Sequence, residues 1–183
     1  MSVFKFLQKR FYAVAIGVLA LSVTACASQN VADRRGETPT FVLEDYFQGE
    51  MTAYGVFDGR RGHLKRKFKV DLKGSWDGET LTLEEDFFYD DGETDRRVWK
   101  FTKTGPNSYV GRAGDVVGEA RIEAAGDAVN LKYLVDLKLS DGSVRVRFDD
   151  WLYLLEDGVA INRAFVRKFG FRVGEVSLVF VKD

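Results

Sequence analysis

From Gly49 to the end of the chain, apolar and polar residues alternate with a period of two, which is typical of strands with one buried face. The runs over residues 63–76, 131–139 and 144–149 place apolar side chains on one face and charged side chains on the other. Helical periodicity is almost absent. Only residues 40–47 predict a single helical turn, with Thr40 as N-cap and with Glu44 and Asp45 exposed.

Turn signals separate these runs about every ten residues, and most are Asp-Gly pairs that favour the positive φ angles of tight hairpins. Nine such turns imply about ten strands, and short connections force neighbouring strands to be antiparallel. We therefore predict an all-β fold over residues 40–183. It is an antiparallel up-and-down meander that closes into a barrel or a strongly curved half-barrel of calycin-like (lipocalin or fatty-acid-binding-protein) shape. The turns are Asp58-Gly59, Asp77-Gly78, Asp91-Gly92, Gly105-Pro106-Asn107, Gly114-Asp115, Gly126-Asp127, Asp141-Gly142, Asp157-Gly158 and Arg172-Val173-Gly174.

Residues 1–25 have a different pattern. A basic start is followed by an apolar run over residues 13–23, which is too short to span a bilayer and predicts a secretory signal peptide. The segment Val23-Thr24-Ala25-Cys26 resembles the bacterial lipobox, where lipid is attached to the cysteine and the chain is cut before it. We expect residues 26–39, which are small and polar, to be a lipidated cysteine and a tether.

Lipidation of Cys26 would provide two or three acyl chains, enough for a stable membrane anchor. The alternative is a free thiol or a core cysteine. Ala27 follows the cysteine, where inner-membrane lipoproteins usually carry aspartate. The lipobox resemblance therefore implies an outer-membrane protein that faces the periplasm.

The composition excludes several classes of site. Cys26 is the only cysteine and His63 the only histidine, so a single chain has no disulfide, no multi-thiolate metal site and no polyhistidine site. Removal of residues 1–25 changes 27 basic and 28 acidic residues to 24 and 28, a net charge near −4. Nucleic-acid binding needs a basic footprint, so we expect no nucleic-acid partner.

Other local signals are weaker. Asp90, Asp91 and Glu93 lack the spacing of known calcium loops, and the chain has neither a glycine-rich phosphate loop nor a nucleophile elbow. His63 starts a strand and is expected to be exposed. The alternation around Lys65-Arg66-Lys67 favours an outer strand face over a patch for anionic lipid. We expect no cofactor and no metal.

Seven segments of the chain resemble an uncharacterised bacterial lipoprotein family, domain of unknown function 3833. They are Phe47-Gln48-Gly49, Glu85-Asp86-Phe87-Phe88-Tyr89, Asp91-Gly92-Glu93, Arg97-Val98-Trp99, Asp150-Trp151, Asn162-Arg163-Ala164 and Lys168-Phe169-Gly170. The resemblance covers nearly all of the chain after Cys26 and implies a lipoprotein that faces the periplasm. It implies no activity. True lipocalins usually open their first strand with Gly-x-Trp, and Gly49-Glu50-Met51 lacks that tryptophan. Gly74-Ser75-Trp76 has the letters of the motif but lies at the end of the second predicted strand, so we do not treat it as the motif.

The turns also predict which side chains meet inside the barrel. A two-residue turn at Asp141-Gly142 brings apolar residues opposite one another and points two polar residues inward among them. The predicted pairs are Val135 with Phe148, Leu137 with Val146, and Tyr133 with Asp150.

The next hairpin has two possible registers. A two-residue turn at Asp157-Gly158 places Arg163 and Arg167 inside, diagonal to Asp150, whereas a three-residue turn places Asn162 and Ala164 there. We favour the arginine register, because the apolar residues Ile161, Phe165 and Phe169 then share the inner face.

Glu85 and Arg97 form a further predicted pair. The apolar residues before and after Asp91-Gly92 are all odd-numbered, so the connection must contain an odd number of residues. A three-residue loop over 90–92, with Gly92 in the left-handed conformation, meets this condition and places Glu85 directly opposite Arg97.

The candidate ligand-binding residues of the barrel interior are therefore Glu85, Arg97, Trp99, Tyr133, Asp150, Arg163 and Arg167. An inward arginine set with a tyrosine could hold a carboxylate or phosphate head group, with apolar walls around the tail. In the alternative interpretation, Glu85–Arg97 and Asp150–Arg163 neutralise each other and only fix the register of the barrel.

These observations favour a non-enzymatic outer-membrane lipoprotein that binds an apolar or amphipathic small ligand. The alternative is an envelope structural or interaction protein with a packed barrel and no small-molecule ligand. A transmembrane barrel with apolar residues outside is a third possibility. Enzymatic activity ranks last, since a glycosidase-like pair of Glu85 and Asp150 has no specific support. The sequence does not indicate an oligomeric state.

Overall fold

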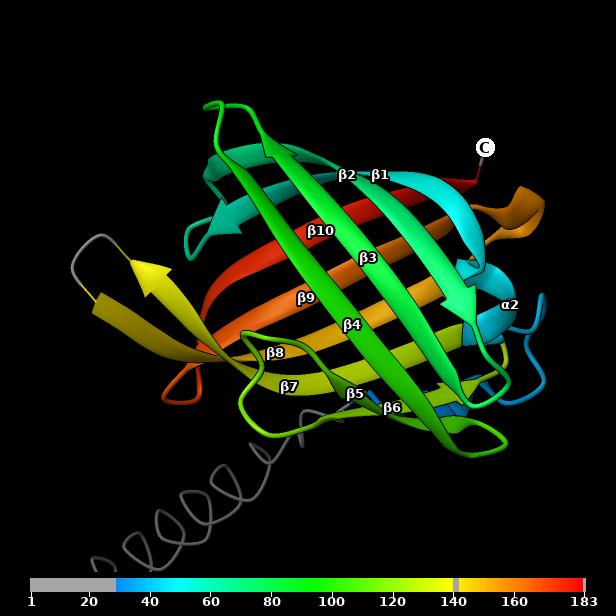
Figure 1. Cartoon of the computed structure of the whole chain (residues 1–183). Helices are drawn as coiled ribbons and strands as arrows, with labels where there is room; N and C mark the ends of the chain where they lie inside the picture. The colour runs from blue at the N-terminus through cyan, green and yellow to red at the C-terminus, as the bar shows by residue number, and fades with distance from the viewer. Residues whose placement is uncertain (1–28, 140–141, 183) are drawn as a thin grey trace, which may run out of the picture.

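The computed structural model describes residues 29–139 and 142–182, in which ten antiparallel strands form one closed barrel (Figure 1). Each strand pairs with its neighbours along the chain, and β1 pairs with β10. The predicted all-β, up-and-down barrel is confirmed. The expected signal peptide and Cys26 lie outside the described residues. The strands are β1 (Gly49–Gly59), β2 (Leu64–Trp76), β3 (Thr80–Tyr89), β4 (Thr94–Gly105), β5 (Ser108–Arg112), β6 (Ala120–Ala125), β7 (Ala128–Leu139), β8 (Gly142–Leu154), β9 (Ala160–Lys168) and β10 (Phe171–Lys182).

The strands bury their apolar face and present charges to the outside. On β2, Val70 and Leu72 are buried while Lys67 and Lys73 are exposed. Outer charges pair across strands, as where Arg145 on β8 donates to both oxygens of Asp136 on β7 at 2.7 Å. A transmembrane barrel has the reverse arrangement, with an apolar band outside.

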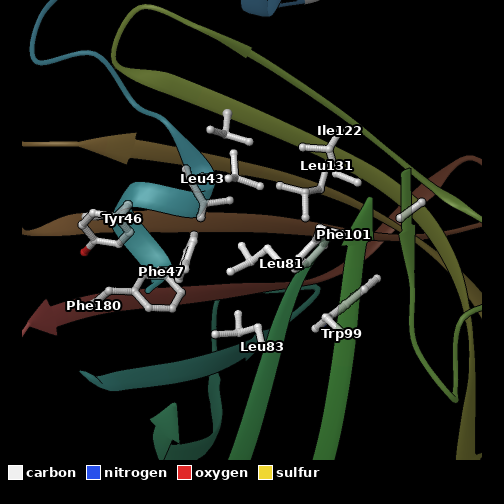
Figure 2. Close-up of a cluster of buried hydrophobic side chains, with 14 of the residues drawn as sticks. Leu43, Tyr46, Phe47, Leu81, Leu83, Trp99, Phe101, Ile122, Leu131 and Phe180 are labelled. Atoms are coloured by element: carbon white, nitrogen blue, oxygen red, sulfur yellow. The ribbon is translucent and has the colours of Figure 1, made fainter. Parts of the chain in front are cut away.

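The short helix α2 (Leu43–Phe47) closes one end of the barrel. Figure 2 shows Leu43 and Phe47 among side chains that come from the surrounding strands. The Phe47 ring packs edge-on against Phe180 of β10, with ring centroids 5.5 Å apart. Helix α2 has only five residues, so burial of this apolar face holds it in place.

The polar side of α2 differs from the prediction in two ways. The N-cap residue is Val42 instead of Thr40, and no side chain caps the helix. Glu44, which was expected to be exposed, is buried and accepts hydrogen bonds from Tyr109 Oη and Lys103 Nζ. The helix enters the barrel end so deeply that its first turn faces β4 and β5, where these two partners lie.

The expected polar tether is packed from Val31 onward. A 3₁₀ helix, η1 (Val31–Arg34), buries Val31 against an apolar patch on the outer face of β6–β8, which consists of Ala125, Ala128 and Trp151. Arg34 Nε donates to Asp127 Oδ1 at 2.9 Å. Because Val31 is the apolar side chain that this segment buries and its other contacts are polar, its mostly polar composition concealed the docking.

The β3–β4 hairpin has the predicted register. Glu85 pairs with Arg97, and the backbone N–H of Tyr89 donates to the carbonyl of Glu93 at 3.0 Å. Gly92 has a φ of 86°, the left-handed conformation that the three-residue loop requires.

The β7–β8 hairpin differs from the prediction by two residues. Its last described pair is Leu139 with Gly142, so the glycine belongs to the strand rather than to the turn. A shift of two residues leaves every side chain on its face, so the apolar pattern alone does not distinguish the two registers. The observed pairs are Val135 with Val146, Leu137 with Val144, Tyr133 with Phe148 and Leu131 with Asp150.

The β8–β9 hairpin reverses the favoured interpretation. Asp150 pairs with Ala164 and Leu152 with Asn162, so Asn162 and Ala164 point inward, and the placement of Arg163 and Arg167 inside was wrong. The connection contains the 3₁₀ helix η2 (Glu156–Gly158), and the N–H of Leu155 donates to the carbonyl of Val159 at 2.7 Å. The connection contains five residues, an odd number, so Arg163 and Arg167 lie on the outer face. Their guanidinium groups therefore stay in water instead of a low-dielectric interior.

The strand pairings and the contacts of helix α2 lie within residues 29–182, so a fragment of residues 27–183 contains the whole barrel and this helix.

Gly74 in β2 makes a very close approach to α2, since a Cβ there would lie 1.7 Å from the carbonyl oxygen of Phe47. Gly74→Ala should lower the free energy of unfolding by about 1–3 kcal/mol, because α2 must move outward. Denaturant unfolding of the fragment measures this change. Gly114→Ala is the control, since a Cβ there meets no atom within 4 Å. Equal effects of the two substitutions would contradict the role assigned to this contact.

Candidate functional site

The interior of the barrel contains a cavity of about 540 Å³. Leu43 and Phe47 of α2 form its floor. At the opposite end, the lining includes Lys65 and Asp95, which are exposed, so the cavity reaches solvent there. Its walls are the inward side chains of β1–β4 and β7–β10, and most are aromatic or aliphatic, among them Phe57, Phe68, Phe87, Trp99, Phe148 and Leu178.

Arg66 lies at this open end. Its guanidinium covers the ring of Tyr89, with Cζ 3.6 Å from the ring centroid. It donates to Asp91 at 2.7 Å and also to Glu93, both in the β3–β4 loop. Arg66 therefore faces inward with Phe68 while Lys67 is exposed, and its charge is neutralised by the loop.

Deeper in the cavity, Arg97 is surrounded by carboxyl groups. It lies directly across from Glu85, and its Nη2 donates to Asp115 Oδ2. Burial raises the pKa of Glu85 from 4.5 to about 7, against the opposing effect of the Arg97 charge. Glu85 lines the cavity and makes no side-chain hydrogen bond to a described residue.

Asp150 lies on the adjoining wall and is 9% exposed. Tyr133 Oη donates to its Oδ2 at 3.0 Å, whereas its Oδ1 is buried and has no hydrogen-bond partner among the described residues. Burial raises the pKa of Asp150 from 3.8 to about 7, although the Tyr133 hydrogen bond and the Arg97 charge lower it. The Tyr133 ring is held between Trp99 and Phe148, each with its centroid 5.2 Å away.

Asn162 on β9 adds a third polar group to this wall. It is 4% exposed, lines the cavity and lies diagonal to Asp150 across the β8–β9 ladder. Its side-chain amide makes no hydrogen bond to a described residue. Two residues of the cavity lining therefore carry unpaired polar atoms, the Asn162 amide and one carboxyl oxygen of Asp150.

The structure brings together five of the seven candidate residues from the sequence. Glu85, Arg97, Trp99, Tyr133 and Asp150 all line the cavity.

Arg163 and Arg167 do not belong to this group and lie exposed on the outer face. Arg163 Nε donates to Glu175 Oε1 at 3.0 Å, and Arg167 faces Arg172 and Arg147 of the adjacent strands. The predicted Asp150–Arg163 pair is therefore wrong, and the hydrogen-bond partner of Asp150 is Tyr133.

Sequence reasoning missed Asp115. From the sequence, Gly114-Asp115 is interpreted only as a turn. In the structure, residues 113–119 run back along β7, and the N–H of Val117 donates to the carbonyl of Leu134 at 2.8 Å. This contact carries Asp115 to Arg97. Residues outside the strands have no period of two, so no sequence signal indicates where their side chains point.

Over residues 29–139 and 142–182, no three His, Cys, Asp or Glu side chains gather in a way that could hold a metal ion. His63 is exposed in the β1–β2 connection. In the same part of the chain, every helix is too short or too polar to cross a membrane.

The family comparison covers the whole barrel. Residues 20–182 match the family model described as protein of unknown function (DUF3833). The chain belongs to this family. None of the curated proteins matches it. The match includes all ten strands and helix α2, so the cavity of this DUF3833 barrel lies within the family domain.

The arrangement in the DUF3833 barrel is suited to holding a mostly apolar molecule. An apolar chamber with a few convergent polar groups is the general form of a small-molecule site. The buried carboxyl groups lower stability at neutral pH, because their charged forms lose hydration without gaining a direct ion pair.

This cost predicts a pH dependence of folding. The pKa of Asp150 is raised in the folded state, so folding favours the protonated carboxyl group. The contribution of this proton to the free energy of unfolding is fully present below about pH 4 and is lost as the pH rises through 7. Asp150→Asn should therefore become more stable relative to the parent chain between pH 4 and pH 8, by up to about 4 kcal/mol at about 1.4 kcal/mol per pKa unit. Denaturant unfolding at several pH values measures this difference.

The matched control is Asp71→Asn on the outer face of β2, where the carboxylate pairs with Lys69 at 2.8 Å. Its difference from the parent should not follow the trend of Asp150→Asn. A pH-independent difference for Asp150→Asn would contradict the account.

Proposed function

We propose that this protein is an outer-membrane lipoprotein, anchored by lipid on Cys26, whose barrel faces the periplasm and binds an apolar or amphipathic small ligand. The cavity carries the proposal. Its volume of about 540 Å³ lies within the range of about 300–1,000 Å³ that is usual for ligand sites. The lipobox resemblance of Val23-Thr24-Ala25-Cys26 supports the anchor.

The form of the cavity supports a small apolar ligand over a packed structural barrel. Aromatic and aliphatic side chains make up most of the wall, and helix α2 seals the floor. Natural interiors are close-packed, so a chamber of this size costs dispersion contacts that an occupant would restore. An envelope protein that acts only through its outer surface needs no such chamber.

The proposal is one of binding without catalysis. The polar groups of the cavity interact with each other, as Tyr133 with Asp150 and Arg97 with Asp115. Nothing in this set is a nucleophile activated by a base. We accordingly assign the cavity to storage, transport or sensing of its ligand.

Blocking the cavity tests the proposal. Val176 of β10 lines the cavity, whereas Val179 of the same strand is exposed on the outside. Val176→Trp in the 27–183 fragment should weaken binding of the apolar fluorophore N-phenylnaphthylamine by about tenfold or more, a loss of about 1.4 kcal/mol. Fluorescence titration measures the affinity.

Val179→Trp adds the same ring outside and should leave the affinity unchanged. Absence of fluorophore binding by the parent fragment, or equal loss in both variants, would contradict the proposal.

The anchor has its own test in cells that express the full chain. Cys26→Ser should abolish both lipidation and cleavage before residue 26, as followed by mass spectrometry of the protein. Ala27→Asp should leave lipidation intact and move the protein to the inner membrane. A parent protein without acyl chains on Cys26 would disprove the anchor, and an Ala27→Asp protein that stays in the outer membrane would disprove the sorting.

A further inference from the structure

The polar groups of the cavity indicate which head group it accepts. Asp150 is the clearest of them, since it lines the cavity and its Oδ1 is buried with no donor among the described residues. Its partner oxygen is already bonded to Tyr133 at 3.0 Å. A buried acceptor without a donor is unfavourable, so a donor supplied by a ligand in the cavity would stabilise it.

Most of the cationic donors of the cavity are engaged, and the exception is Arg66 Nε at the open end, which is buried and has no hydrogen-bond partner among the described residues. Arg97 donates to Asp115 and faces Glu85, and Arg66 donates to Asp91 and Glu93 at the open end. Lys65 lies at the open end and is exposed. An anionic head group at the depth of Asp150 would therefore meet carboxyl groups rather than a free guanidinium.

The outward placement of Arg163 and Arg167 strengthens this conclusion. A pocket for a carboxylate or phosphate generally uses arginine forks with unpaired donors. Strand β9 instead contributes Asn162, which is 4% exposed, lines the cavity and makes no side-chain hydrogen bond to a described residue. The Asn162 amide offers both an acceptor and donors, and together with the carboxyl groups of Asp150 and Glu85 it leaves acceptors in excess.

We propose that the ligand carries a hydrogen-bond donor, a hydroxyl, amide or ammonium group, on an apolar body, and that this donor bonds to Asp150 with Asn162 and Glu85 beside it. The inference rests on the proposed function, because it assigns the head group of the ligand in that same cavity. It replaces the carboxylate or phosphate head group expected from an inward arginine set.

A displacement assay on the 27–183 fragment tests the head group. N-phenylnaphthylamine is bound first and is then displaced at pH 7.5 by dodecanol, dodecylamine or dodecanoate, which share one chain length. Dodecanol and dodecylamine should displace it at concentrations at least about tenfold below that of dodecanoate, which corresponds to about 1.4 kcal/mol. Displacement by dodecanoate at an equal or lower concentration would overturn the inference and leave the cavity proposal standing. Failure of the fluorophore to bind would overturn both.

Two substitutions locate the contact. Asp150→Leu and Asn162→Leu keep the approximate size of each side chain and remove its polar atoms. Each should lower the affinity for dodecanol by about tenfold and reduce its advantage over dodecanoate, while N-phenylnaphthylamine still binds. Asn162→Leu serves on its own if Asp150→Leu does not fold. Asp71→Leu, on the outer face of β2, is the control and should change neither affinity. An unchanged preference for dodecanol in Asn162→Leu and in a folded Asp150→Leu would overturn the assignment.

Discussion

The pairing of β1 with β10 is the interaction on which the rest of the structure depends. It joins the first strand to the last from Met51–Lys182 to Gly59–Gly174, and so turns a meander into a ring without open edges. Glycine permits dense packing at this seam, since a Cβ at Gly174 would lie 2.6 Å from the Phe57 ring. Once the ring is closed, the inner faces of the strands enclose a space, and helix α2 seals one end of it. The cavity is what this closure leaves unfilled.

Two environments follow from the closed ring. Outside, arginine and carboxylate side chains pair in water, where each pair contributes little to stability. Inside, burial raises the pKa of both Glu85 and Asp150 to about 7, and Asp150 Oδ1 has no donor among the described residues. A sequence selected for stability alone would replace such groups with apolar residues of similar size. Their presence beside an apolar chamber is the physical reason to assign the chamber to ligand binding.

The contacts that follow from the two-residue period of strands could be predicted from the sequence. The contacts that depend on the length of a loop could not. Glu85 and Arg97 were placed opposite each other because the apolar residues on both sides demand an odd loop. The position of the β7–β8 turn was not determined, because a shift of two residues keeps Tyr133 and Asp150 on the inner face. The β8–β9 loop decides whether Arg163 or Asn162 points inward, and the apolar pattern of β9 is compatible with both. Asp115 lies outside any strand, so its contact with Arg97 depends on how residues 113–119 pack against β7.

The most direct measurement of the central claim is native mass spectrometry of the protein released from the membranes of its own host. The account predicts a 1:1 complex with a small molecule whose dissociated mass fits an apolar body bearing a hydroxyl, amide or amine. Recovery of only the bare polypeptide and its anchor, together with an interior that takes up no added apolar ligand, would contradict it.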